Sequence, residues 1–164
     1  MNLVYVYKFD SEFCDRLISI VDKTKCYSYE ICRAENPDIE ELHPTNSLQF
    51  IIDNNTYEGE QISDVVNGII NNISSIKSII QIADNTKKYT PHKHQNSYVI
   101  VSLLNDSFEG GRVSIDNTLI SLQKGECICI TPSQIVNIEP ILSGERYWLV
   151  VYIDTINKNN KSII

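Results

Sequence analysis

The second half of the chain is a series of short β-rich segments separated by turn residues, and this pattern constrains the fold most. Asp116 and Asn117 predict a tight two-residue hairpin between two of these segments. So many short strands, with no helical pattern between them, favour a two-sheet sandwich or barrel. The strands are expected at about 78–84, 97–104, 111–116, 118–123, 126–131 and 145–154.

The first half of the chain adds two amphipathic helices, which makes the predicted fold class α+β. A helix over about 11–24 begins with Ser11 as its N-cap, and a second helix covers about 60–76, where Gly68 weakens the pattern. Further strands are expected at about 3–9, 27–33 and 47–53. A polar loop containing Pro37 and Pro44 is expected between the last two.

The length of 164 residues predicts a single domain over residues 1–156, followed by a frayed tail at 157–164. The formal net charge of −7 argues against nucleic acid as a partner, because binding to phosphates needs a basic face. The apolar runs are the length of strands and are too short to cross a bilayer, so no membrane partner is expected.

The five cysteines have no spacing typical of a disulfide framework, and their number is odd. This predicts reduced thiols and a cytoplasmic, reducing compartment, which includes the cytoplasm of a host cell. Cys127 and Cys129 lie two positions apart on a predicted strand and therefore face the same side. We expect them to pack as small apolar residues rather than to bind a metal as a pair.

Two of the three histidines, His92 and His94, stand together just before the most strand-like segment. Alternate residues entering a strand point the same way, so the two imidazoles could share a metal ion such as iron, zinc, nickel or copper. The alternative is that both are loop histidines that bind no metal. The pair by itself leaves both interpretations open.

The segments that follow form a recognisable series. Leu104-Asn105 precedes a turn that closes in Gly110-Gly111, Lys124-Gly125 precedes a strand, and Ser143-Gly144-Glu145-Arg146 precedes the last strand. With the first helix, this series resembles the prolyl-4-hydroxylase-like branch of the 2-oxoglutarate/Fe(II) dioxygenases. The resemblance implies a double-stranded β-helix, or jelly-roll barrel, of about eight strands with two supporting helices.

The resemblance also implies a site for Fe(II) and 2-oxoglutarate. His92 matches the first iron ligand, His94 stands where the family has an aspartate, and Val136 stands where it has its distal histidine. Arg146 matches the cation that binds the far carboxylate of 2-oxoglutarate, and Tyr89 matches a tyrosine beside the cosubstrate. No histidine follows His94, so the expected iron site is degenerate and no catalytic residue is assigned.

Two functions remain open. The first is an inactive oxygenase-like domain used as a binding or structural module with a protein partner, as a homo-oligomer or within a larger assembly such as a virus or phage particle. The second is an active hydroxylase that uses Fe(II), 2-oxoglutarate and an atypical His-x-His site. Inward packing of Ile135, Val136 and Ile138 would fill the barrel with apolar atoms.

Two other classes fit less well. A cupin shares the barrel but needs a histidine near position 136 and a glutamate soon after the His-x-His pair, and neither is present. A cysteine hydrolase needs a sequence motif around its nucleophile, and none of the five cysteines has one.

Overall fold

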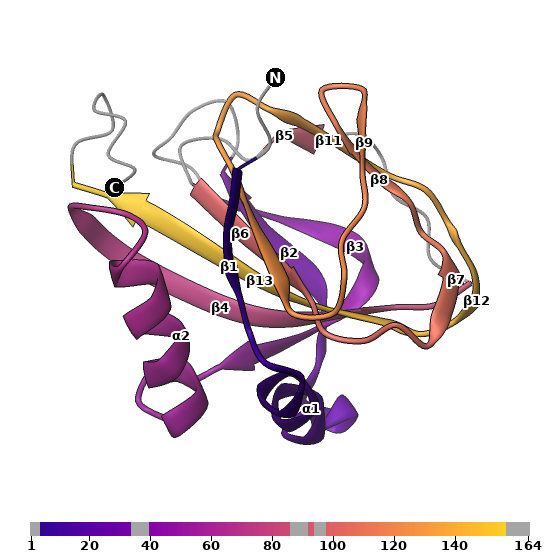
Figure 1. Cartoon of the computed structure of the whole chain (residues 1–164), viewed down its shortest axis with the longest axis horizontal. Coiled ribbons are helices and arrows are strands. Elements are labelled where there is room, and N and C mark those ends of the chain that lie inside the picture. Colours follow the sequence, from indigo (N-terminus) through magenta and orange to yellow (C-terminus); the bar gives the residue numbers. More distant parts are fainter. Residues whose placement is uncertain (1–3, 34–39, 86–91, 94–97, 157–164) are drawn as a thin grey trace.

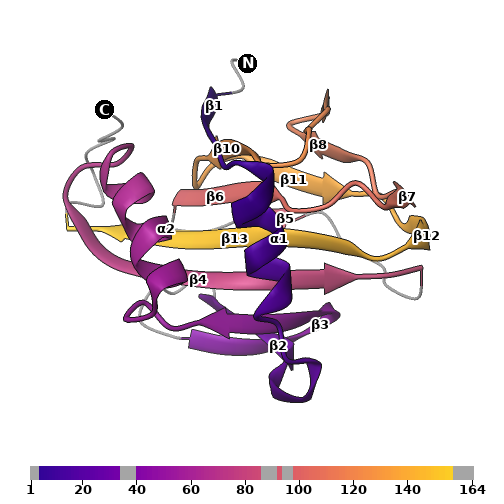
Figure 2. The same cartoon turned by 60° about the horizontal axis from the view of Figure 1, so that its bottom comes forward.

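The computed structural model describes residues 4–33, 40–85, 92–93 and 98–156; for Val4, 28–33, 40–47 and 92–93 it describes the backbone alone. Two helices lie on one face of a large sheet, and a smaller sheet covers part of the other face (Figures 1 and 2). The helices are α1 (Ser11–Ser19) and α2 (Tyr57–Asn67), with a short 3₁₀ turn, η1, at Lys23–Lys25. Neither helix is long and apolar enough to span a membrane.

The large sheet has seven strands in the order β1-β10-β6-β13-β4-β3-β2. Their bounds, in that order, are Val4–Lys8, Glu126–Ile130, Tyr98–Leu103, Arg146–Thr155, Ile73–Ala83, Glu40–Ile52 and Tyr27–Arg33. The second sheet has the order β5-β11-β8-β9, with bounds His92–Lys93, Ile135–Ile138, Val113–Ile115 and Thr118–Ile120. A two-stranded ribbon joins β12 (Ile141–Gly144) to β7 (Phe108–Gly110).

The chain alternates between the two main sheets in a way that defines the fold. It runs from β4 in the large sheet to β5 in the small one, back to β6, across to β8 and β9, back to β10, across to β11, and finally to β13. These eight strands form a double-stranded β-helix, with β10-β6-β13-β4 facing β5-β11-β8-β9. The predicted α+β class, the jelly-roll barrel and its two supporting helices are confirmed.

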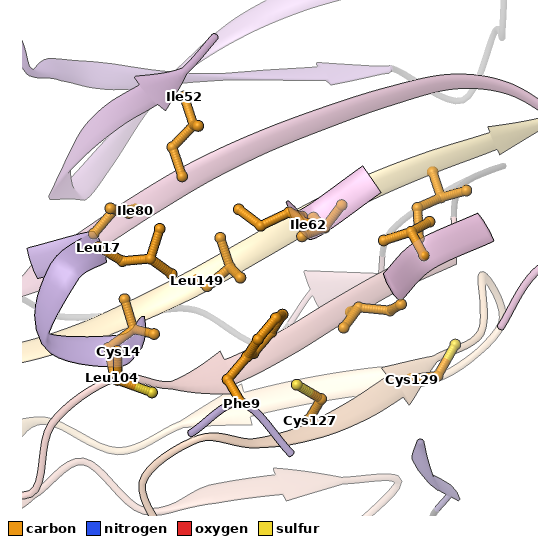
Figure 3. Close-up of a cluster of buried hydrophobic side chains, with 14 of the residues drawn as sticks. Phe9, Cys14, Leu17, Ile52, Ile62, Ile80, Leu104, Cys127, Cys129 and Leu149 are labelled. Carbon is orange, nitrogen blue, oxygen red and sulfur yellow. The ribbon is translucent and has the colours of Figure 1, made fainter. Parts of the chain in front are cut away.

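Two apolar cores share the central strands. Leu149, Val151 and Ile153 on β13 pack in the core beneath the helices, whereas Trp148 and Val150 pack between the two sheets. All six residues of β6 are buried for the same reason. A strand covered on both faces is a continuous apolar run rather than an alternating one. Figure 3 shows the helix-side core, where Leu17, Ile62, Ile80 and Leu149 meet.

The first helix begins at residue 11, as predicted, but has a different N-cap and ends sooner. Asp10, not Ser11, is its N-cap, and its carboxylate accepts a hydrogen bond from the backbone N–H of Phe13 at 2.7 Å. The helix ends at Ser19, and part of the remaining predicted length forms η1. Cys14 and Leu17 are fully buried and attach α1 to the sheet.

The second helix was predicted too late and too long. It spans Tyr57–Asn67 with Thr56 as N-cap and Gly68 as C-cap, and Ile73 already belongs to β4. Asn72 has φ of +56°, which reverses the chain between the two elements. The first isoleucines of β4 happen to continue the apolar spacing of the helix. Periodicity alone does not separate a helix from a buried strand that follows it closely, so the predicted helix ran into β4.

Several strands were extended or missed. Pro44 lies within β3 rather than in a loop, next to a register shift between Tyr27 and Tyr29 of β2, where a proline can be accommodated. The short strands β5, β7, β11 and β12 have too few residues to produce a pattern in the sequence. The Asp116-Asn117 hairpin is confirmed, with φ of +48° and +65°. The predicted tail at 157–164 lies outside the described residues.

Leu17 tests the attachment of α1. Leu17→Ala removes a fully buried side chain from the helix-side core, so we expect the free energy of unfolding to fall by about 2–5 kcal/mol. Urea denaturation followed by circular dichroism measures it. Glu12→Ala, at an exposed position on the same helix, is the control and should cost less than about 1 kcal/mol. Equal losses for the two variants would contradict this packing.

Candidate functional site

The backbone register of the small sheet brings together the two positions that matter most for a metal site. In the antiparallel pair β5–β11, His92 lies directly opposite Val136, and Lys93 opposite Ile135. Residues in such pairs have Cβ atoms about 5 Å apart. Tyr89 and His94 lie outside the described residues, so the structure relates only His92, Val136 and Arg146 of the predicted site.

The Val136 side chain packs into the core between the sheets. Only 2% of Val136 is exposed, and Ile138 is also buried in this core, whereas Ile135 is 43% exposed. Strand alternation explains the difference, because successive side chains of β11 point to opposite faces. Inward packing therefore holds for Val136 and Ile138 and is wrong for Ile135. Their neighbours in this core include Ile115, Ile130, Trp148 and Val150.

Arg146 is the first residue of β13, and only 2% of it is exposed. Its Nη1 donates a hydrogen bond to the backbone oxygen of Gly111 at 3.2 Å, and its Cζ lies 3.8 Å from the ring centroid of Trp148. The stacking is a cation–π contact, which gains strength where the cation is shielded from water. The guanidinium is therefore held by groups of the chain itself.

Gly111 makes this arrangement possible. Its φ of +66° favours glycine, and a Cβ at this position would lie 2.9 Å from Nη1 of Arg146 and even closer to the side chain of Ile141. The Gly110-Gly111 pair therefore provides a turn through which the backbone approaches the buried guanidinium.

Asn105 holds the start of β13. Its Nδ2 donates to the backbone oxygen of Glu145 at 2.8 Å, and its Oδ1 accepts from the backbone N–H of Tyr147 at 2.9 Å. These two bonds bracket Arg146 on both sides. The Leu104-Asn105 pair thus positions the arginine through the backbone.

Two further turns have structural explanations. Gly125 has φ of +88°, and a Cβ there would collide with the backbone oxygen of Phe9. Gly144 has φ of +78°, and a Cβ there would lie 2.6 Å from the backbone oxygen of Ser107. Lys124, beside Gly125, pairs with Asp15 of α1 at 2.6 Å. The glycine motifs of the sequence therefore mark close backbone approaches.

A polar row crosses the large sheet beside Arg146. Trp148 of β13 pairs with Gln81 of β4, which pairs with Gln49 of β3. The Trp148 Nε1 and the Gln49 Nε2 are buried and have no hydrogen-bond partner in the described part of the chain. Together with the guanidinium, these residues place polar groups on this face of the barrel, and none of them is a carboxylate.

The cysteines of β10 are packed as predicted. Cys127 is fully buried and Cys129 is 6% exposed, both within the helix-side core. Burial raises the pKa of each thiol to about 11, so the thiols are protonated and poorly nucleophilic at neutral pH. Over the described ranges, no three His, Cys, Asp or Glu side chains gather into a metal-binding group.

Comparison with solved structures identifies the class of fold. A prolyl-4-hydroxylase from Pseudomonas putida superimposes with a TM-score of 0.62 at 10% identity, over 94% of this chain and 95% of that one. A viral collagen prolyl hydroxylase from Paramecium bursaria Chlorella virus-1 gives 0.61 at 12% identity, over 95% and 90%. A prolyl hydroxylase from Trichoplax adhaerens gives 0.62 at 9% identity, over 98% and 87%.

The chain has the fold of the prolyl hydroxylases within the 2-oxoglutarate/Fe(II) oxygenases. The likeness extends over nearly the whole length on both sides. No protein-family profile and no curated protein matches the sequence. At these identities the similarity concerns the fold alone.

Sequence reasoning did not find the partners of Arg146. The place of Trp148 two residues after Arg146, on the same strand face, is the signal that could have paired them. Gln49 and Gln81 gave no signal, because their alignment depends on the registers of three strands that are distant in sequence.

Asn105 offers a test of how the site is held. Asn105→Ala removes both bonds to the backbone around Arg146, so we expect about 1–3 kcal/mol lower stability, measured by urea denaturation. Asn67→Ala, at an exposed position, is the matched control and should change stability by less than about 0.5 kcal/mol. Equal stability of Asn105→Ala and the unaltered protein would contradict this role.

Proposed function

We propose that this chain is a catalytically inactive domain with the 2-oxoglutarate/Fe(II) oxygenase fold, and that it acts as a binding or structural module for a protein partner. The observation that carries the proposal is the pairing of His92 with Val136. The position opposite the histidine holds a buried aliphatic side chain that cannot ligate a metal.

The described residues do not fit the iron that the fold family implies. Such a site needs two imidazoles and a carboxylate on one face of the metal. Val136 offers no donor atom, and its side chain belongs to the apolar cluster between the sheets. Asn137, the next residue on β11, is on the opposite, exposed side of the strand. No catalytic step is therefore derived through a metal.

The surroundings of Arg146 also support a non-catalytic barrel. Its guanidinium donates to Gly111 and stacks on Trp148, so a carboxylate ligand would have to compete with contacts that the chain already makes. The indole of Trp148 and the buried side chains of Val136 and Ile138 belong to one apolar cluster between the sheets. A domain of this kind uses its surface, as an oligomer or within a larger cytoplasmic or viral assembly.

The second candidate is an active hydroxylase, and one observation favours it. Arg146 stands at the start of the last barrel strand and is directed inward, as a group that binds a dicarboxylate would be. In that case Arg146 would hold the far carboxylate of 2-oxoglutarate, and His92 and His94 would hold the metal.

Thermal unfolding separates the two candidates. We expect no rise in melting temperature on adding Mn(II), 2-oxoglutarate or both. Binding would be detected, because a ligand at a hundredfold excess over its dissociation constant stabilises the fold by about 2.7 kcal/mol. The His92→Ala variant is measured in parallel. A rise that requires both ligands and is lost in His92→Ala would contradict the proposal and support the enzyme.

A gain-of-binding variant tests whether Val136 is what prevents metal binding. We expect Val136→His, combined with His94→Asp, to bind Mn(II) detectably by thermal shift, because the register sets position 136 opposite His92. The control is Ile138→His with His94→Asp, since position 138 is on the same face of β11 but is not the position paired with His92. Equal Mn(II) binding by both variants would show that the register is not responsible.

A further inference from the structure

A groove opens on the helical side of the molecule, outside the barrel. It lies between β1, the first turns of α1 and the start of α2, and has a volume of about 300 Å³. Figure 2 shows the two helices side by side on the large sheet. Because β1 is the outermost strand of that sheet, no further strand of the sheet closes the groove on that side.

Aromatic rings form the walls of the groove. Tyr7 and Phe9 of the β1 segment meet edge to face with centroids 5.0 Å apart, and Phe13 of α1 lies 5.1 Å from Phe9. Tyr57, the first residue of α2, stands on the opposite rim. Tyr7 is 46% exposed and Tyr57 54% exposed.

The charge of the groove is negative. Its lining includes Asp10, Glu12 and one cation, Arg16. The Arg16 guanidinium already binds the Glu58 carboxylate at 2.8 Å and lies 4.5 Å above the Tyr57 ring. This contact lowers the pKa of Glu58 and raises that of Arg16, so both stay charged at neutral pH. The carboxylates of Asp10 and Glu12 are exposed and make no ion pair in the described part of the chain.

Local structure explains part of this arrangement. Asp10 caps α1, and Glu12 stands in its first turn, where a negative charge interacts favourably with the helix dipole. Neither effect requires the exposed Tyr7 ring, which lies on the groove next to these carboxylates. Aromatic rings that are partly exposed next to carboxylates favour a cation with an apolar stem, such as a lysine or arginine side chain.

We infer that this groove binds an extended basic segment of a partner protein. The cationic head of a lysine or arginine would lie against Asp10 and Glu12, and its methylene stem would pack on Tyr7 and Phe13. The net charge of −7 adds long-range attraction for such a partner. The groove lies on the side of the sheet covered by the helices, so the inference holds whether the barrel is active or not.

Fluorescence anisotropy tests the inference with a labelled, blocked hexapeptide of alternating lysine and alanine. We expect saturable binding below about 1 mM that weakens as salt is added, and no binding of the matching glutamate–alanine peptide. Asp10→Asn with Glu12→Gln should weaken binding at least about tenfold. Asparagine still caps the helix, so this variant removes charge and keeps α1. Tyr7→Ala should weaken binding as well.

The control removes the same amount of charge elsewhere. Asp64→Asn with Glu109→Gln changes two exposed carboxylates that do not line the groove. We expect this variant to bind the basic peptide as the unaltered protein does. An equal loss of binding in this variant, or no binding of the basic peptide at about 1 mM, would overturn the inference. Thermal unfolding of each variant verifies that the fold is intact, and the Mn(II) titration reports separately on the barrel.

Discussion

The structure depends on one strand that is buried on both faces. β13 pairs with β4 over its whole length and with β6 over much of it, and its side chains alternate between the two cores. Leu149 and Val151 support the helices, while Trp148 and Val150 support the small sheet. Because one strand serves both cores, the position of Arg146 at its start is fixed by the packing of the entire domain. The Asn105 bonds on either side of the arginine secure that end of the strand.

The motifs that link this chain to the oxygenases have geometric explanations that require no catalysis. Gly111 and Gly125 allow close backbone approaches, and Asn105 holds a strand end. These functions persist whether or not iron is bound. The ligand positions are a separate matter, because a ligand must offer a donor atom, and Val136 offers none. The frame of the fold is therefore held by contacts within the chain, among them the stacking of Arg146 on Trp148.

The helical side of the molecule has a groove whose surface differs from the core of the barrel. The core between the sheets holds a large apolar cluster, whereas the groove beside α1 combines exposed rings with the exposed carboxylates of Asp10 and Glu12. A single exposed aromatic ring is common on a protein surface. Here two exposed rings, Tyr7 and Tyr57, line the same groove. This is the kind of surface expected of a module that acts through a partner.

The sequence by itself determined the fold class, the Asp116-Asn117 hairpin and the packing of Cys127 and Cys129, because these follow from alternation and turn chemistry within a few residues. It also placed Arg146 at the start of the last strand. It did not separate α2 from β4, since their apolar residues run on in one spacing, and it could not detect strands as short as β5 and β11. Only the tertiary structure set Val136 opposite His92, stacked Arg146 on Trp148 and brought Tyr7, Phe13 and Tyr57 around one groove. Val136 and His92, and Tyr57 and the two other rings of the groove, are far apart in the chain, so strand register and helix packing, which no local pattern encodes, bring them together. Arg146 and Trp148 are close in sequence, and the packing around the start of β13 presses them against each other.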